Sequence, residues 1–408
     1  MRILLVVSMV PQADGLGAIP KLLHAQLAGL RSGNEVTVVG SFGDLPGQVE
    51  AARELMRAPD LSAHFADRRR ASSAARRWRV RGELAATWMT KPWPWRAVSA
   101  TGGVQAMVDR AVAEGPFDVV ALEEDLMAVL RLPPGTPVVL TEHEAIQASA
   151  KGWRAASLRE RPEMWLRRRD WRRWPQFRRT AWRRADLVQV YSQGDADAID
   201  RADPALASRV RVNPFGLFPP PAADPGFEQP GTILFTGTFT HLPNREAALW
   251  LAREILPAVR AKAPAASLRI VGSAPPAEIR DLAGQGIEVV ADAPEMEPHL
   301  RAAAVVVAPV RSGGGMRMKV LEAMARAKAV VTTPLGAEGF TSIDPRPPLA
   351  IAEDSAGIAA ALASLLGDEA GRRDLGRRAR EFTLRHHTPE AWAKRLEAVY
   401  LEARQPRP

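Results

Sequence analysis

Two kinds of apolar pattern alternate along the first forty residues. Residues 3–7 (ILLVV) form a continuous apolar run, which indicates a strand buried on both faces of a parallel sheet. From residue 19 to residue 30 the apolar side chains recur at helical spacing, and Gly33 and Asn34 end that helix. Residues 36–39 (VTVV) make a second strand. The pattern therefore predicts a β-α-β unit at the start of the chain.

The alternation continues in two series, separated by a stretch rich in proline and glycine at residues 204–230, which we predict to be a linker. In the first series, further strands are predicted at residues 118–122, 137–141 and 187–191. In the second series, strands are predicted at residues 232–236, 267–271, 287–290, 305–309 and 329–332, and helices at 245–261, 276–283, 296–303, 317–327, 355–366, 369–383 and 389–403.

The two series predict an α/β protein made of two doubly wound Rossmann-like domains that face each other across a cleft. We expect the first domain at residues 1–215 and the second at residues 216–385. Residues 386–408 carry the last helix, which we expect to pack back on the first domain. Ligands of such sheets bind at the carboxyl ends of the strands.

Composition excludes several classes of function. The chain of 408 residues has no cysteine, which excludes disulfide frameworks, iron-sulfur clusters, zinc-cysteine sites and thiol nucleophiles. No apolar run reaches the roughly 18 residues that span a bilayer. The opening run MRILLVVSMV stops at Pro11 without a cleavage site of small residues, so a buried strand explains it better than a signal peptide. We therefore expect a cytoplasmic protein.

The net charge of +9 is concentrated in two segments of the first half. Residues 68–96 carry a net +8 and residues 151–184 a net +10, so the rest of the chain is net negative. The same segments hold nine of the 11 tryptophans. Arginine beside tryptophan suits peripheral contact with an anionic membrane, at the inner face in a cytoplasmic protein. A solvated cationic face over tryptophans packed in the core, or an anionic soluble acceptor or acidic polysaccharide, would explain the composition too. No nucleic-acid-binding module is present, so no nucleic-acid partner is expected.

The strongest candidate for chemistry is the segment VVVAPVRSGGGMRMKVLEAMARAKAVV. A buried strand leads into three glycines and then into a helix whose first turns carry Arg317, Lys319 and Glu322. Glycine lets backbone N–H groups approach an anion, and the start of a helix adds partial positive charge. Glu322 lies further along, where it suits the hydroxyls of a ribose. The alternative is a flexible connection followed by a solvated helix. The motif GxxxxGK[ST] is absent, so this is not a Walker loop.

Three further segments complete the pattern: FTGTFTHLPNREAALW, the TEHE segment at residues 141–144, and RADLVQVYS followed by NPFG. Through these segments and the glycine-rich segment described above, the chain resembles the GT-B glycosyltransferases of family 4, the "group 1" retaining enzymes. The form with GTFTHLPN and GGGxRxK is typical of a subgroup that makes exopolysaccharides and other cell-surface glycans. The resemblance implies that the second domain binds a nucleoside diphosphate sugar and the first domain binds the acceptor. It also implies transfer of the sugar with retention of configuration.

The resemblance also assigns residues. The first glutamate of the family's E-x7-E motif falls on Gly314, and the second, which binds ribose, falls on Glu322. The family's usual GR…K pair is absent, because Thr238 follows Gly237 and no lysine lies between Thr238 and Arg245. We therefore assign the diphosphate to Arg317, Lys319 and the N–H groups of Gly315 and Met316. His143 is the expected catalytic or sugar-positioning residue, and Glu142 and Glu144 flank it. The donor site comprises Gly237, Thr238, His241, Asn244, Gly314, Gly315, Met316, Arg317, Lys319 and Glu322, and the phosphate loop of the first domain contains Gly15 and Gly17.

These features predict a retaining glycosyltransferase with a glycan, a lipid-linked or a small-molecule acceptor. Such an enzyme needs no cofactor and no metal, and we expect Asp195 and Asp197 to cap a helix rather than to bind an ion. One alternative is a catalytically inactive GT-B partner subunit, because Gly314 replaces a motif glutamate. Another is a nicotinamide-dependent Rossmann oxidoreductase, although neither glycine turn reads GxGxxG.

Overall fold

The computed structural model describes residues 1–408 except 16, 69–73, 147–160 and 406–408, and describes only the backbone at 74–81, 161–164 and 225. The chain divides into two compact units. Unit 1 comprises Met1–Tyr191, Asp195–Asn213 and Trp392–Pro408, and unit 2 comprises Ser192–Gly194 and Pro214–Ala391. Each unit is built on a parallel sheet, so the prediction of two doubly wound α/β domains is confirmed.

The sheet of unit 1 has seven strands in the order β3-β2-β1-β4-β5-β6-β7. All neighbouring strands are parallel, and Ile3 of β1 lies between Val36 and Val119. The central strands are almost wholly buried, which explains their continuous apolar runs. The strands are β1 (Arg2–Val6), β2 (Glu35–Phe42), β3 (Ser62–Asp67), β4 (Val119–Glu123), β5 (Val138–Glu142), β6 (Leu187–Val190) and β7 (Val210–Val212).

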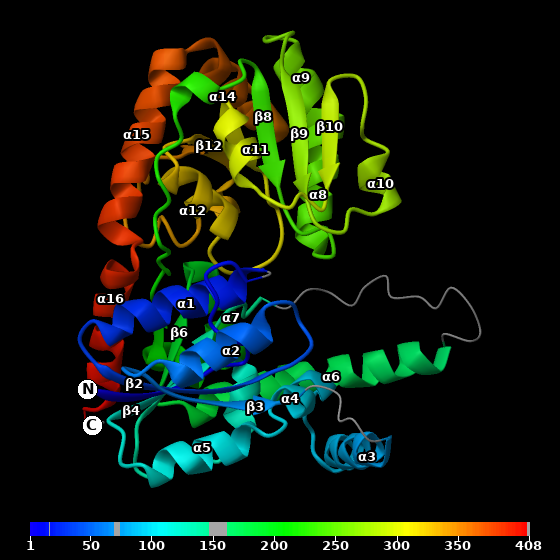
Figure 1. Ribbon diagram of the computed structural model, residues 1–408. Helices are drawn as coiled ribbons and strands as arrows, with labels where there is room; N and C mark the ends of the chain where they lie inside the picture. Colours follow the sequence, from blue (N-terminus) through cyan, green and yellow to red (C-terminus); the bar gives the residue numbers. More distant parts are fainter. Residues whose placement is uncertain (16, 69–73, 147–160, 406–408) are drawn as a thin grey trace. The chain divides into compact units, whose positions relative to one another are not determined.

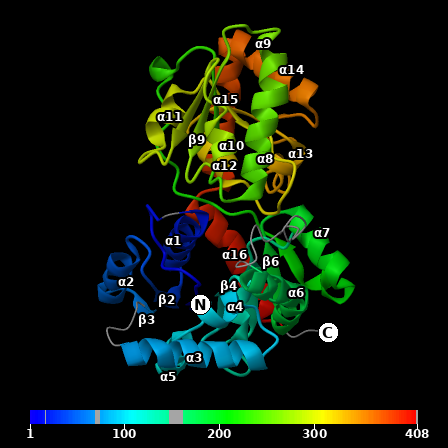
Figure 2. The same ribbon diagram turned by 90° about the vertical axis from the view of Figure 1, so that its right-hand side faces the viewer.

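Helices flank this sheet, and α2 and α7 lie at opposite ends of the unit, as the strand order requires (Figure 2). The last helix, α16 (Pro389–Ala403), buries Trp392, Leu396 and Tyr400, and Trp392 meets the ring of Tyr191 edge-on at 6.2 Å. The other helices are α1 (Ala18–Arg31), α2 (Gln48–Arg57), α3 (Ala74–Thr90), α4 (Trp95–Ala100), α5 (Val104–Ala113), α6 (Arg161–Arg184) and α7 (Gln193–Ala202), with 3-10 turns at Asp125–Val129 and Pro204–Arg209.

The sheet of unit 2 has six parallel strands in the order β10-β9-β8-β11-β12-β13. Helix α15 packs against the β12 side of this sheet, whereas α10 lies beside β10 at the other edge (Figure 1). The strands are β8 (Thr232–Thr236), β9 (Ser267–Gly272), β10 (Ile287–Ala291), β11 (Val305–Ala308), β12 (Ala329–Thr332) and β13 (Ala350–Ile351).

The helices of unit 2 follow the predicted spacing closely. Asp354 and Asp368 each accept a hydrogen bond from a backbone N–H of the helix that follows, and so begin α14 and α15. The helices are α8 (Leu242–Trp250), a π-helical turn at Leu251–Ile255, α9 (Leu256–Arg260), α10 (Ala277–Arg280), α11 (Glu297–Ala302), α12 (Met318–Ala325), α13 (Pro334–Ala337), α14 (Ser355–Gly367) and α15 (Glu369–His386).

Two predictions about segments need correction. Residues 204–230 are not a linker throughout, because Val210–Val212 form the edge strand β7 and hydrogen-bond to β6. The helix predicted at 317–327 ends at Ala325, because Ala327 adopts a left-handed φ of 59° that a helix cannot continue through. The chain nevertheless reaches β12 as expected.

Candidate functional site

The glycine-rich turn of unit 2 joins β11 to α12. Gly313 and Gly315 have φ of 91° and 75°, in the left-handed region that favours glycine. Gly314, Gly315 and Met316 are buried. Arg317 immediately precedes α12, and its guanidinium donates to the carbonyl oxygens of Gly313, at 2.9 Å, and Gly314. The arginine therefore fixes the shape of the turn from which it projects.

Lys319 is the second cation of the turn and is half-buried in the first turn of α12. Its ammonium donates to the carbonyl oxygen of Thr236 and to Oδ1 of Asn244, at 2.7 Å, and lies 4.4 Å from the ring centroid of Phe235. Burial, together with the nearby charge of Arg317, lowers the pKa of Lys319 to about 7. An anion bound beside it would favour the charged form and raise that pKa.

The loop after β8 meets this turn through Asn244. The Asn244 amide donates to the carbonyl oxygen of Thr238 at 2.8 Å, while its Oδ1 accepts from Lys319. A Cβ on Gly237 would lie 2.9 Å from Cγ of Asn244, so a side chain at this position would displace the asparagine. Asn244, predicted as a ligand contact, thus positions Lys319, and His241 is exposed at the start of α8.

Glu322 lies three residues beyond Lys319 on α12 and is half-buried, and its backbone oxygen accepts from Arg326 at 3.0 Å. The structure therefore brings the predicted residues of unit 2 onto two adjoining loops and the first turns of one helix. Two cations, the N–H groups of a glycine turn and one carboxylate lie close in sequence and space. This set of groups can bind a diphosphate and a neighbouring hydroxyl group.

In unit 1, His143 follows β5 and pairs with a fully buried carboxylate. Its Nε2 donates to Oε2 of Glu123 at 3.1 Å, and Oε1 of Glu123 accepts from Gln26 at 2.6 Å and Thr141 at 3.0 Å. Burial lowers the pKa of His143, but the bond to Glu123 and the charges of Glu124, Glu123 and Glu142 outweigh it, so the pKa is raised. Among the described residues, Nδ1 has no hydrogen-bond partner.

The sequence analysis named Glu142 and Glu144 beside this histidine but missed the acidic residues at the end of β4. Glu123, Glu124 and Asp125 follow one another at the end of β4, and this run of three acids after a buried strand was the available signal. Asp125 accepts from Arg178 at 3.1 Å, and burial raises its pKa against the charge of Arg178. Burial, with the charge of Asp125, also raises the pKa of Glu142 to about 8.

The other predicted features of unit 1 are spread along the same edge of the sheet. Gly15 is buried, and a Cβ at this position would lie 2.4 Å from Cβ of Pro20, which is too close for any side chain. Gly17 immediately precedes α1 and has a φ of 86°. Asp195 lies in the first turn of α7, and its Oδ1 accepts from the backbone N–H of Ala145 at 2.9 Å. In the described part of the chain, no cluster of histidine and acidic residues could hold a metal ion.

The tryptophans of the basic segments divide between core and surface. Trp182 is buried and donates to Glu142 at 2.8 Å, as expected if tryptophans pack beneath a charged face. Trp95 and Trp165, in contrast, are 42% and 59% exposed, and the Arg169 guanidinium lies 5.6 Å from the Trp165 ring. Residues 69–73 and 151–160 of these segments lie outside the described residues.

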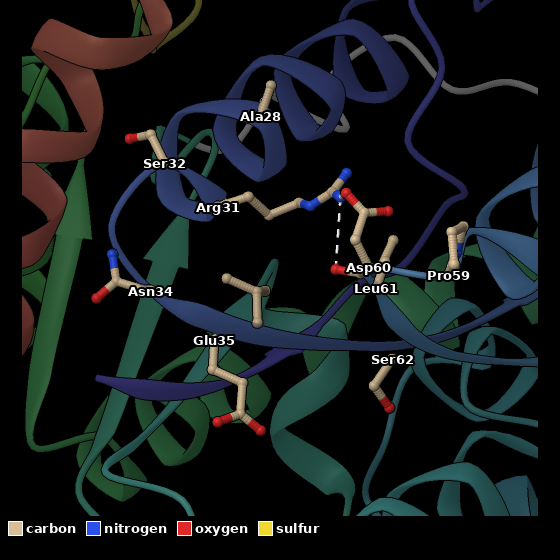
Figure 3. Close-up of a pocket in the computed structure, with 10 residues that line it drawn as sticks. Ala28, Arg31, Ser32, Asn34, Glu35, Pro59, Asp60, Leu61 and Ser62 are labelled. Atoms are coloured by element: carbon tan, nitrogen blue, oxygen red, sulfur yellow. Dashed lines mark hydrogen bonds and ion pairs between the residues drawn. The ribbon is translucent and has the colours of Figure 1, made fainter.

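A cavity of about 770 Å³ lies at the other end of the unit 1 sheet, where α1 ends and β2 and β3 begin. Figure 3 shows Arg31 reaching from α1 to Asp60, with which it forms an ion pair, and Ser32, Asn34 and Ser62 around the cavity. Ligands of parallel sheets bind at the carboxyl ends of strands, whereas this cavity lies at the amino ends. None of the predicted site residues lines it.

A family model matches most of unit 2. The family model described as glycosyl transferases group 1 matches residues 230–368, from just before β8 to the end of α14. The matched segment contains both loops and the helix that carry the predicted donor site. No curated protein sequence matches the chain.

Solved structures resemble the chain over both units. A sucrose-phosphate synthase from Thermosynechococcus elongatus is 19% identical, with a TM-score of 0.63, over 98% of this chain and 98% of its own. Anabaena HepE, solved in complex with UDP, is 11% identical, with a TM-score of 0.62, over 98% and 100%. TarM is 12% identical, with a TM-score of 0.52, over 69% of this chain, which spans about half (54%) of TarM.

At these identities the likeness establishes the fold, with two parallel-sheet α/β domains of seven and six strands as in the GT-B glycosyltransferases. The described residues include no helix with the length and hydropathy needed to cross a membrane. Residues 230–368 therefore match the model of the glycosyl transferases group 1 family, in a chain that has the GT-B fold.

Proposed function

We propose that this protein is a retaining glycosyltransferase that moves a sugar from a nucleoside diphosphate sugar to a glycan, a lipid-linked or a small-molecule acceptor. The observation that carries the proposal is the pair of cations at the glycine-rich turn. The Lys319 ammonium donates to a carbonyl oxygen and to one amide oxygen, which are neutral acceptors, and Arg317 lies beside it on the same turn. A diphosphate would supply the negative charge that the acceptors of Lys319 lack.

Transfer of this kind needs charge stabilisation more than a side-chain nucleophile. In the proposed reaction the bond between the sugar and the diphosphate breaks, the acceptor oxygen bonds to the sugar on the same face, and the leaving diphosphate takes the acceptor's proton. Arg317, Lys319 and the N–H groups of Gly315 and Met316 would stabilise the charge on the leaving diphosphate. Glu322 would accept hydrogen bonds from the ribose.

We assign the sugar-positioning role to His143. Its Nε2 is occupied by Glu123, which leaves Nδ1 as the ring atom without a partner among the described residues. The raised pKa of His143 favours a cationic ring, which suits a group that faces developing negative charge. Gly15 and Gly17 would let the loop after β1 approach the donor phosphates.

The donor nucleotide to test first is uridine diphosphate. HepE was solved with UDP-glucose, and an E. coli protein with the same fold was solved with UDP-2-fluoro glucose. Polysaccharide biosynthesis is the setting that the subgroup resemblance suggests.

We also propose that residues 68–96 and 151–184 contact an anionic membrane at its cytoplasmic face. Met89, Trp95, Trp165 and Leu166 are exposed apolar side chains on α3, α4 and α6, close in sequence to exposed arginines. Flotation with vesicles of phosphatidylglycerol and phosphatidylcholine tests this contact. Binding should fall with added salt and with Trp165→Ser, and wild-type protein that does not float would reject it.

One alternative remains specific to this chain: a non-catalytic GT-B subunit. Gly314 occupies the place of a motif glutamate. Because glycine has no side chain, this position brings no carboxylate to the donor sugar. The nicotinamide-dependent alternative is not proposed, because the family match covers the segment that would have to bind the dinucleotide.

Incubation of the protein with UDP-sugars and candidate acceptors, followed by proton NMR, tests the function. The proposal predicts release of UDP and a product with the anomeric configuration of the donor. UDP binding without hydrolysis or transfer across a broad panel of donors would favour the non-catalytic subunit. An inverted product would reject the retaining mechanism.

A further inference from the structure

A second polar cavity, of about 450 Å³, lies at the carboxyl edge of the unit 1 sheet. Residues that follow four neighbouring strands line it: Ser8 after β1, Asp44 after β2, Arg68 after β3 and Glu124 after β4. Gln48 of α2 and Arg96 and Ser99 of α4 also contribute polar side chains. This is the edge at which parallel sheets bind ligands, and the volume is that of a small-molecule site.

Arg68 supplies the cavity with an uncompensated cation. Its backbone N–H extends the pairing of β3 with β2 by donating to Phe42 at 2.9 Å, and its Nη1 donates to the carbonyl oxygen of Ser99 at 2.6 Å. No carboxylate of the described residues pairs with this guanidinium. Because a guanidinium has five N–H donors, Arg68 retains the capacity to bind a planar anionic group through two of them.

Ser8 is a buried hydroxyl without a partner. Only 6% of the residue is exposed, and its Oγ has no hydrogen-bond partner in the described structure. Buried polar atoms are normally hydrogen-bonded, so an orphan hydroxyl that lines a cavity indicates a place for a ligand oxygen.

Glu124 is held against the cavity in a backbone conformation that a glutamate seldom adopts. Its φ is 73°, in the left-handed region, and the residue is largely buried. Its carboxylate lies 3.4 Å from the Arg96 guanidinium, so the two charges compensate each other. Strain of this kind persists where the surrounding structure fixes a side chain in place, and it is common at binding sites. Glu124 therefore offers fixed oxygen atoms that accept hydrogen bonds from hydroxyl groups.

We propose that this cavity binds a sugar that carries a carboxylate or phosphate group, with the anion on Arg68, hydroxyls on Glu124 and a ligand oxygen on Ser8. A neutral sugar would leave Arg68 without a counter-charge. Asp44 opposes an anion. Asp44 and Arg68 are both exposed to solvent, which screens their charges, so the preference for an anion depends on the hydrogen bonds that the Arg68 guanidinium donates directly to it. The inference rests on the proposed function, in which this sugar is the acceptor.

Calorimetric titration of the full chain with glucuronic acid, glucose 6-phosphate, glucose and inorganic phosphate tests the proposal. One of the two anionic sugars should bind at least tenfold more tightly than glucose, and which one does so identifies the anionic group. Arg68→Gln should weaken that binding at least tenfold and Ser8→Ala severalfold. Arg57→Gln, which removes an exposed arginine of α2, should leave it unchanged.

UDP titration of the same variants separates this proposal from the proposed function. Arg68→Gln should retain wild-type UDP affinity, which also shows that the variant is folded. Equal binding of glucose, binding unaffected by Arg68→Gln, phosphate alone binding as tightly as either anionic sugar, or no binding of any sugar would each overturn the proposal. A wild-type protein that does not bind UDP would instead count against the proposed function.

Discussion

The glycine-rich turn of unit 2 and the carboxyl edge of unit 1 handle charge in opposite ways. At the turn, the Lys319 ammonium is held by neutral oxygen atoms of the protein. At the edge of unit 1, His143 and Arg178 are each held by carboxylates. Lys319 thus retains its charge for a ligand, whereas the charges around His143 largely balance one another and fix the orientation of the imidazole ring.

The largest effect on UDP affinity is expected from substitution of Lys319. Lys319→Met keeps much of the side-chain volume and removes the charge, so affinity for UDP should fall by about 1.5–3 kcal/mol, the contribution of a charge-assisted hydrogen bond. Calorimetric titration measures this loss. Lys262→Met removes an exposed lysine of the same unit and should have no effect. Equal affinities of both variants would show that Lys319 holds the fold and not the nucleotide.

The same lysine predicts how UDP binding depends on pH. Its pKa is about 7 in the free protein because burial disfavours the charge, and a bound diphosphate would raise it. Binding therefore takes up a proton above pH 7, and affinity should fall as pH rises, by at most about tenfold per pH unit. Titrations between about pH 7.5 and 8.5, where the diphosphate is fully ionised and the uracil base is still neutral, measure the slope. Lys319→Met should show none, and a persistent slope would assign the effect to another group.

In unit 1, the corresponding prediction concerns His143. Glu123→Gln removes a charge that favours the protonated imidazole, while burial continues to disfavour it, so the pKa of His143 should fall. An NMR titration of the imidazole resonances measures the change. Glu54→Gln, on the exposed face of α2, serves as the control. A pKa that does not move would mean that the other acids dominate.

The smallest effect is expected at Glu322. Glu322→Gln weakens hydrogen bonds to ribose hydroxyls, so UDP affinity should fall by about 0.5–1.5 kcal/mol. Inorganic pyrophosphate lacks a ribose, and its affinity should be unchanged in the same variant. Glu295→Gln, at an exposed position of unit 2, should affect neither ligand. A loss of pyrophosphate binding would place Glu322 beside the phosphates instead of the ribose.

Continuous apolar runs allowed most of the fold to be predicted. Strands such as β1 and β11 are buried on both faces, and burial demands apolar side chains at every position. The strands that escaped prediction, β3, β7 and β13, are short or half-exposed and lie at or near a sheet edge. Their sequences meet no such demand, so the apolar pattern does not identify them.

The candidate site could be predicted only where its residues are close in sequence. The turn from Gly313 to Glu322 is one continuous segment, and its chemistry follows from residue order. Asn244 contacts Lys319 from 75 positions away, and Glu123 contacts His143 from another strand. Such partners are determined by the order of strands in the sheet, which single-sequence patterns do not specify.

A crystal structure of the protein with UDP would show whether the glycine-rich turn binds the nucleotide. The diphosphate should lie at residues 313–319, within hydrogen-bond distance of the N–H groups of Gly315 and Met316 and of the Arg317 and Lys319 side chains. The ribose should lie beside Glu322. A diphosphate bound elsewhere, with Lys319 still donating to Thr236 and Asn244, would rule out this donor site.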